Sequence, residues 1–310
     1  MPDKVKLGLG LGAWPFGQLD PGRFLACIDR AEGLGIDSVW LSDRLVGGGV
    51  VLEPVVALAV AAGRTRRLKL GTSVLIPALR QPVVLAKELA TLDFLSGGRL
   101  LLTVGLGLDD PAEFAAAGIA KSERAGRTDE AIDLMRRLWA GAPVTFSGRY
   151  FRVENVEIWP KPGRPGGPPV WVGGRSEAAL DRTARLGDGW LASSITPDEF
   201  AAGRRRIEEL LRRYGRTIEP DHYGAYLPFF VAESRSRAWE LAGPYLPRRR
   251  TDVDPAAYSA IGTLADCRAV IDRYLAAGAV KFVLRPVGPP ETLGEQLEIL
   301  AEELCPIYEG

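Results

Sequence analysis

Polar and small residues stand at the ends of three short apolar runs in the first third of the chain. The runs SVWLS, LKLGTSVLI and RLLLTVGLG alternate with segments of helical periodicity between Leu34 and Gly107. Continuous apolar runs of this length are typical of strands that are buried on both faces of a parallel sheet. In such sheets, ligands bind where the strands end. The residues at these ends, which indicate a binding site, are Asp43 and Arg44, Ser73 and Val74, and Gly105 and Gly107.

Arg44 limits the chemistry of this site. An arginine side chain keeps its proton at any working pH, so Arg44 cannot serve as a general base. It can stabilise negative charge that develops on a substrate oxygen, or bind an anionic substrate. The alternative is a structural ion pair between Arg44 and Asp43 or another neighbouring acid.

A second candidate site follows a later strand, in PVWVGGRSEAAL. Glycines let a ligand approach the backbone closely, and a helix N-terminus offers free N–H groups to phosphate. Arg175 can add a charge-assisted contact. The segment Gly173, Gly174, Arg175 and Ser176 therefore fits a phosphate site, and the alternative is an ordinary tight turn with Ser176 as a helix cap.

The whole chain alternates between strand-like and helical segments. Eight strands in alternation with eight helices predict an α/β fold, a (β/α)8 TIM barrel in which residues 1–310 form one domain. Trp40 and Trp171 are expected to pack in the barrel or at its interface with the helices. The strand candidates are Val5–Leu11, Ser38–Leu41, Leu68–Ile76, Arg99–Val104, Val170–Val172, Gly189–Ala192, Tyr223–Val231 and Lys281–Leu284.

Two segments interrupt the alternation. Residues 144–159 hold β-like runs on both sides of a turn at Ser147-Gly148, which predicts a hairpin insertion. Residues 243–260 are polar and broken by prolines, which predicts a second insertion in the form of a mobile loop.

Charge and cysteine content bear on the class of partner and on the cellular compartment. Acidic and basic residues balance at 39 each, which gives no support for nucleic acid or a membrane surface as a partner. Arginine clusters such as Arg248–Arg250 are interpreted as solvated surface. Three scattered cysteines without a CxxC pair favour a reducing compartment with no disulfide and no metal site. We find no signal peptide and no apolar run of membrane length, so we expect a cytoplasmic protein.

Five motifs resemble the bacterial-luciferase-like oxidoreductases, and they cover nearly the whole chain in order. They are AEGLGIDSVWLSDR, LGTSVLIPALRQPVVLAKELATLDFLSGGRLLLTVGLG, EAIDLMRRLW, PVWVGGRSEAALDRTARLGDGW and AGAVKFVLRP. The resemblance implies a (β/α)8 barrel with insertions, which agrees with the strand count. It also implies a small-molecule substrate and a cofactor at the barrel mouth. The WLSD and GTSV sequences look closer to the branch that uses the deazaflavin F420, and FMN is the alternative cofactor.

The resemblance also implies roles for individual residues. The Ser73–Val74 peptide matches a non-prolyl cis bond beneath the flavin ring, with a regular strand as the alternative. Asp43 matches a polar residue that faces the ring or the substrate. The residues that match the cofactor lining are Gly105, Leu106 and Gly107, and those that match its phosphate end are Gly173, Gly174, Arg175 and Ser176.

The chain departs from the family pattern at Arg44, where the family often has His. This departure puts in doubt an oxidation that needs a base, and it leaves open the reduction of a polarised C=C or C=N bond. We therefore expect an F420-dependent oxidoreductase that works as a reductase. The alternatives are an FMN-dependent monooxygenase and a flavin-binding protein without catalysis. A separate flavin or F420 reductase would supply the electrons. An unrelated phosphate-sugar barrel enzyme is disfavoured, because its expected Lys or paired carboxylates are missing from the strand ends.

Three further expectations concern aromatic, basic and apolar segments. Trp14 and Phe16, after the first strand, are expected to wall the substrate pocket or to form a hydrophobic lid. Arg285, at the end of the last strand, faces either the cofactor or only the Pro286 turn. The apolar helices near residues 53–62 and 82–95 predict a homodimer interface, and burial against the barrel is the other explanation of their composition.

Overall fold

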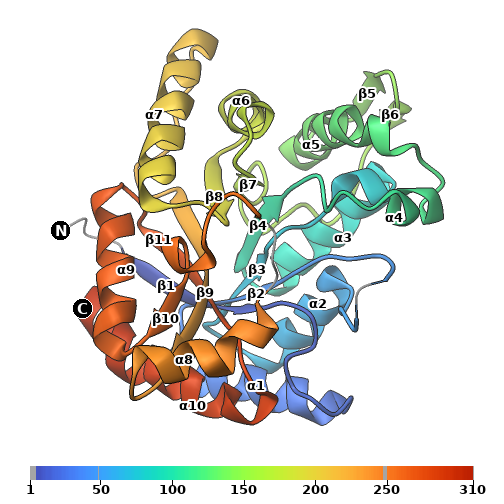
Figure 1. Cartoon of the computed structure of the whole chain (residues 1–310). Helices are drawn as coiled ribbons and strands as arrows, with labels where there is room; N and C mark the ends of the chain where they lie inside the picture. The colour runs from blue at the N-terminus through green and yellow to red at the C-terminus, as the bar shows by residue number, and fades with distance from the viewer. Residues whose placement is uncertain (1–4, 48, 247–249, 310) are drawn as a thin grey trace.

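The barrel closes through eight parallel strands. The computed structural model describes residues 5–47, 49–246 and 250–309. Within them the strands follow the order β1-β2-β3-β4-β7-β8-β9-β11, and β11 pairs back with β1 (Figure 1). The prediction of a (β/α)8 TIM barrel is confirmed. The strand bounds are β1 (Lys6–Leu11), β2 (Ser38–Leu41), β3 (Lys69–Thr72), β4 (Leu100–Val104), β7 (Val170–Gly173), β8 (Gly189–Ser193), β9 (Tyr223–Val231) and β11 (Lys281–Pro286).

Helices surround this barrel (Figure 1). The sequence analysis missed α4, α8, α11 and the three-residue strand β10 (Ala260–Gly262), because each is too short to show a clear period. The helix bounds are α1 (Pro21–Gly33), α2 (Pro54–Arg64), α3 (Pro82–Leu95), α4 (Pro111–Ala116), α5 (Arg124–Ala140), α6 (Glu177–Leu186), α7 (Pro197–Tyr214), α8 (Arg235–Ala242), α9 (Leu264–Ala276), α10 (Leu293–Glu298) and α11 (Cys305–Tyr308), with a π-helical turn over Ile299–Leu304.

Both insertions lie outside the closed sheet. The predicted hairpin is present as antiparallel strands β5 (Val144–Ser147) and β6 (Arg152–Val156), beside α5 (Figure 1). In the second insertion, the described residues form two short 3₁₀ turns and then enter β10, which pairs with β9. Residues 247–249 of this insertion lie outside the described residues.

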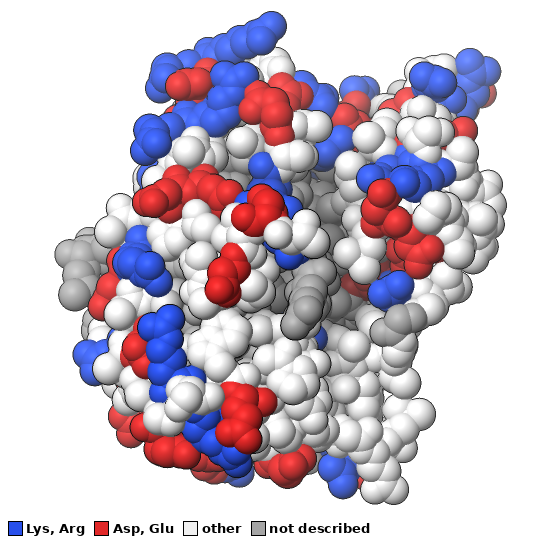
Figure 2. All heavy atoms as spheres, in the orientation of Figure 1, with Lys and Arg blue, Asp and Glu red and all other residues white. Residues whose placement is uncertain are grey.

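Local sequence signals explain where helices begin. Asp20 accepts a hydrogen bond from Gly22 N at 2.9 Å and so caps α1, as its position before Pro21 predicts. Thr196 and Glu199 form a reciprocal capping box at the start of α7. The arginines of α7 produce the concentration of basic side chains at the top of Figure 2. No helix among the described residues is long and apolar enough to span a membrane.

Paired charges close the amino-terminal end of the barrel, which we call the floor. Lys281, at the start of β11, donates to Asp37, and Lys69, at the start of β3, donates to the same carboxylate at 2.7 Å. The side chains of Asp37 and Lys281 are only 7% and 9% exposed. Burial alone would raise the pKa of Asp37, but the two ammonium groups bring it down to about 2. The floor is thus held by an internally neutralised carboxylate.

Candidate active site

Inward-facing side chains divide the barrel interior into a filled layer and an open mouth. Successive inward positions lie two residues apart along each strand. The middle layer is a buried cluster of Trp40, Trp171, Leu191 and Val283, with Leu101 and Tyr226 packed against it. Two residues beyond Trp40, Trp171 and Leu191 the side chains are small, at Ser42, Gly173 and Ser193, whereas Arg285 follows Val283. The large side chains fill the centre of the barrel, as predicted for the two tryptophans. The small ones leave a hollow at the carboxyl ends of the strands.

Glycines of β1 make room for two polar side chains from neighbouring strands. A Cβ on Gly10 would stand 3.1 Å from the ring of Tyr226 and 3.3 Å from Cβ of Arg285. A Cβ on Gly12 would stand 2.7 Å from the guanidinium carbon of Arg285. Any larger residue would displace these groups. The alternating glycines in KLGLGLG therefore provide the space for Tyr226 and Arg285 at the barrel mouth.

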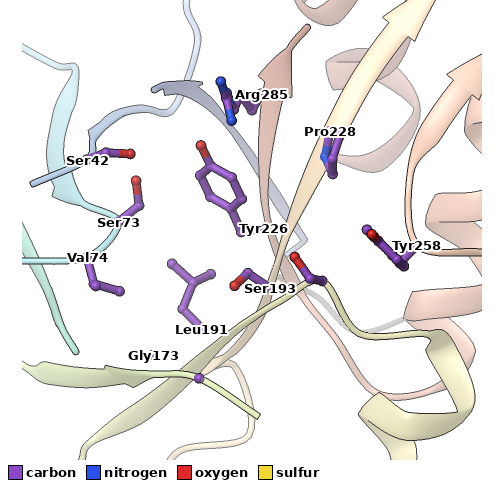
Figure 3. A pocket seen from close by; sticks show the side chains of 12 residues that line it. Ser42, Ser73, Val74, Gly173, Leu191, Ser193, Tyr226, Pro228, Tyr258 and Arg285 are labelled. Carbon is purple, nitrogen blue, oxygen red and sulfur yellow. The ribbon is translucent and has the colours of Figure 1, made fainter. Parts of the chain in front are cut away.

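The hollow at the mouth is a small pocket that is partly open to solvent. Figure 3 shows side chains from β8, β9, β11 and the segments that directly follow β2 and β3 converging on it. Its lining consists of Ser42, Ser73, Val74, Gly173, Gly174, Leu191, Ser193, Ser194, Tyr226, Pro228, Tyr258 and Arg285.

Several polar groups of this lining have no protein partner. The hydroxyls of Ser73 and Tyr258 are buried without a hydrogen bond. The side chains of Arg285 and Tyr226 make no hydrogen bond or ion pair with any residue that the structure describes. Buried polar groups are normally satisfied. A set of unsatisfied donors around one cavity is therefore typical of a binding site for a polar ligand.

The Ser73–Val74 peptide is cis, as predicted. Val74 projects between two glycines: a Cβ on Gly105 would stand 2.7 Å from Val74, and a Cβ on Gly173 2.5 Å from it. Likewise, a Cβ on Gly107 would stand 2.8 Å from Ile76. Gly105 and Gly107 are thus not among the residues that line the cavity; Gly105 adjoins it through Val74, whereas Ile76, beside Gly107, does not line it. A direct contact between Leu106 and the cofactor stays a prediction.

Asp43 does not face the cavity, which corrects the expectation from the sequence. Its side chain is 2% exposed and pairs with both guanidinium nitrogens of Arg80, at 2.5 and 2.9 Å. It also accepts a hydrogen bond from Ile76 N at 2.8 Å. Because Arg80 donates to Glu53 as well, at 2.8 Å, Asp43 belongs to a network that ties the end of β2 to the segment after Val74. A carboxylate already engaged by these donors is a structural group.

Arg44 also points away from the cavity. Its guanidinium lies 3.3 Å from Asp110, and its Nε donates to Val46 O at 2.9 Å. The ion pair with a neighbouring acid, stated above as the alternative, is thus present, with Asp110 in place of Asp43. The residue that brings a positive charge into the cavity is Arg285, whose direction the sequence left open and which pairs with none of the described acidic residues.

The candidate phosphate end lies where β7 meets α6. Gly174 has a φ of +115°, a conformation that L side chains rarely adopt, and its carbonyl accepts a hydrogen bond from Trp190 at 2.7 Å. Ser176 caps α6 through Ala179 N at 3.3 Å. Arg175 is exposed and has no hydrogen-bond partner among the described residues. The turn therefore has the helix cap of the first alternative, and it also offers the guanidinium of Arg175 as a hydrogen-bond donor.

Arg250 corrects the interpretation of the arginine cluster as solvated surface. Its side chain is 5% exposed and pairs with Glu199 at 2.7 Å and Asp252 at 2.6 Å. It also donates to Ser194 O at 3.2 Å. Arg250 therefore fastens the second insertion over the cavity and places Tyr258 in its lining. Arg248 and Arg249 lie outside the described residues.

A smaller apolar pocket adjoins the mouth at Ser42. It is lined by Leu11, Gly12, Trp14, Pro15, Phe16, Phe24, Leu41, Ser42 and Leu52. The rings of Trp14 and Phe16 meet edge to face with centroids 4.8 Å apart. Both predicted residues thus wall a pocket that shares Ser42 with the cavity.

Comparison with known proteins agrees with this arrangement. A family model described as luciferase-like monooxygenase matches residues 6–304. The chain belongs to this family.

Relatives in the family include dehydrogenases and monooxygenases. The F420-dependent glucose-6-phosphate dehydrogenase of Amycolatopsis mediterranei is 34% identical over 231 residues, which cover 69% of this chain and 68% of that protein. The F420-dependent hydroxymycolic acid dehydrogenase of Mycobacterium tuberculosis is 32% identical over 318 residues, 94% of this chain and 86% of that protein. The crystal structure of monooxygenase RslO1 from Streptomyces bottropensis has a TM-score of 0.82 at 25% identity, covering 98% of this chain and all of RslO1. Five glucose-6-phosphate dehydrogenases are matched over 54–68% of their own length.

Family membership and geometry together show what sequence reasoning missed. Tyr226 and Tyr258 were not singled out, although both line the cavity. Tyr226 lies in an apolar strand, where a tyrosine is indistinguishable from an ordinary core aromatic residue. The available signal was the alternation of glycines in β1, which indicates that large side chains from other strands need the space.

Proposed function

We propose that this member of the luciferase-like family is an F420-dependent oxidoreductase that works as a reductase, passing hydride between the deazaflavin and a small organic substrate. The observation that carries this proposal is the composition of the cavity. Among the residues that the structure describes, Arg285 has no acidic partner, and the lining that they form contains no His, Asp, Glu or Lys. Oxidation of an alcohol needs a general base. Reduction of a polarised double bond needs an electrophile, which Arg285 supplies.

The cavity fits a flavin-type cofactor. Val74 offers an apolar surface for the ring, and the unpaired hydroxyl of Ser73 offers it a hydrogen bond. The turn from Gly174 to Ser176, with the free Arg175, would hold the phosphate. A bound deazaflavin supplies the hydride, while the protein orients it and excludes water.

FMN is the second candidate cofactor. RslO1, which is a monooxygenase by name, shares the fold of the whole chain. With FMN this chain would be a monooxygenase fed by a separate flavin reductase, and with F420 the electrons would come from a separate F420 reductase. A flavin-binding protein without catalysis is the remaining alternative.

Parallel titrations of the purified protein with F420 and FMN, read by fluorescence, test the cofactor. We expect F420 to bind more tightly. Reduced F420 is then mixed with candidate acceptors, and its oxidation is followed by absorbance. Tighter binding of FMN with oxygen consumption would favour the monooxygenase, and binding without oxidation by any acceptor would favour the non-catalytic protein.

Arg175→Ala tests the phosphate end. Because Arg175 is exposed and unpartnered, its removal should leave the melting temperature unchanged. We expect the dissociation constant of F420 to rise about tenfold, from the loss of one charge-assisted contact. Arg213→Ala, on the exposed end of α7, is the matched control. Equal affinities of the two variants would place the phosphate elsewhere.

We also propose a homodimer through α2 and α3. These helices line a groove whose apolar side chains include Val56, Val84 and Leu95, 65%, 55% and 74% exposed. Exposed apolar residues that gather in one groove are typical of an interface. We propose that the same helix pair of a second copy packs on this groove, because the two-fold contact of a homodimer uses the same surface of both subunits.

Sedimentation velocity at micromolar concentration checks the dimer. Leu95→Glu should shift the protein to a monomer. Leu19→Glu, at a position 65% exposed outside the groove, is the control. A wild-type protein that sediments as a monomer would contradict the proposal.

A cytoplasmic location completes the proposal. It is supported by three cysteines that are all unpaired, Cys27, Cys267 and Cys305. Fractionation of the producing cells is the measurement that checks it.

A further inference from the structure

We propose that Tyr226 is the proton donor of this reduction and that the substrate is a carbonyl compound with a conjugated C=C bond. Arg285 would bind the carbonyl oxygen, and Tyr226 would protonate the carbon next to the carbonyl. This inference rests on the proposed function and adds the substrate class and the second reacting group.

The placement of Tyr226 is the first argument. It lies on β9, where it pairs with Val283 of β11, so that Arg285 stands two residues further along the neighbouring strand. The Tyr226 ring and Cβ of Arg285 lie within 3.3 Å of one point, the position of a Cβ on Gly10. The ring packs against the barrel interior. In Figure 3 its hydroxyl points toward the region between Ser73 and Arg285. A fixed ring with a free hydroxyl beside a free cation is a preorganised donor pair.

The second argument is that the other groups of the lining are poorer donors. The serine hydroxyls are much weaker acids than a phenol. Tyr258 is the other phenol, but its hydroxyl is fully buried, and burial raises its pKa. The charged groups that act on it are Arg250, Arg175, Asp252 and Asp254, and Arg285 is not among them. Only Tyr226 combines phenol acidity with a position next to Arg285.

The step balances as follows. The β-carbon of the substrate accepts hydride from the reduced deazaflavin, and the electrons of the C=C bond move through the carbonyl to its oxygen. Arg285 stabilises the resulting enolate. The enolate electrons then re-form the C=O bond while the α-carbon takes the proton of Tyr226. Arg285 also stabilises the tyrosinate, which regains a proton from water at the mouth. The substrate gains one hydride and one proton.

The first test needs no turnover. 4-Nitrophenolate, a planar oxyanion, is titrated by absorbance into the protein with and without oxidised F420. We expect Tyr226→Phe and Arg285→Met each to weaken binding at least tenfold. Tyr245→Phe, an exposed tyrosine outside the cavity, is the control and should bind as the wild type does. Unchanged binding by Tyr226→Phe would overturn the proposal even if F420 does not bind at all.

The second test uses the stereocentre that protonation creates. In single turnovers with reduced F420, the wild-type protein should reduce 2-methylcyclohex-2-enone to one enantiomer of 2-methylcyclohexanone. Tyr226→Phe should be about 10²-fold slower, at unchanged F420 affinity, and should give a nearly racemic product. A fast, enantioselective variant would show that Tyr226 is not the donor. A wild-type protein that binds F420 but reduces no enone would overturn the substrate class, whereas one that binds no F420 would contradict the proposed function itself.

Discussion

The two ends of the barrel treat their charged side chains in opposite ways. At the floor, Lys281 and Lys69 converge on Asp37, and the carboxylate is fully engaged. At the mouth, Arg285 has no acidic partner among the described residues and shares a cavity with free hydroxyls. An unpaired charge costs free energy that folding must offset elsewhere. The comparison teaches that the floor serves stability, whereas the mouth keeps its polar groups available to a ligand.

Removing the floor carboxylate should have the largest effect. Asp37→Ala leaves Lys281 buried without its partner, which should lower the free energy of unfolding by about 3–5 kcal/mol. Urea denaturation measures the loss. The double variant Asp37→Leu with Lys281→Met should recover most of it, because no buried charge remains. A loss below about 1 kcal/mol in the single variant would mean that the floor does not depend on this cluster.

At the mouth, the same kind of change should spare stability and impair chemistry. Arg285→Met should leave the free energy of unfolding within about 0.5 kcal/mol of the wild type or raise it, as is common at functional sites. Loss of one electrophilic donor should slow hydride transfer about 10²–10³-fold. Denaturation and single-turnover kinetics on the same preparation check both halves. A strongly destabilised variant would show that Arg285 makes a structural ion pair, which would contradict the difference between floor and mouth.

Acid should act on the floor through Asp37. Its pKa is about 2 in the folded protein and about 3.9 in an unfolded chain. The stabilisation is therefore complete above about pH 4 and is lost as the pH falls through about 2, a change on the order of 2 kcal/mol. Urea denaturation at a series of pH values measures it. Asp37→Asn should lack this slope, and an equal slope in both proteins would assign acid sensitivity to other carboxylates.

The smallest effect is expected at Arg44, the arginine that the sequence singled out. Since its partner Asp110 is partly exposed, Arg44→Ala should cost about 0.5–1 kcal/mol of stability. Turnover should stay within threefold of the wild type, against the 10²–10³-fold loss that an electrophile would show. Steady-state kinetics decide between the two, and a loss as large as that of Arg285→Met would restore the first interpretation.

The fold was predictable because its signals are local. Buried parallel strands produce continuous apolar runs, and helix caps such as Asp20-Pro21 mark the elements between them. The strands Ser38–Leu41 and Tyr223–Val231 have the predicted bounds. The cis peptide at Ser73–Val74 was implied by resemblance alone, since nothing in the local sequence requires it.

The chemistry of the mouth was decided by tertiary structure. Sequence order makes Asp43 and Arg44 natural partners, yet the barrel brings Arg80 to Asp43 and Asp110 to Arg44. It brings Tyr226 and Arg285 together beside Gly10 of β1, although these residues lie far apart in the chain. The sequence by itself determined which strands and helices form and that their ends would hold a site. Which charges are neutralised and which stay free depends on distances between strands, and these distances exist only once the barrel has closed.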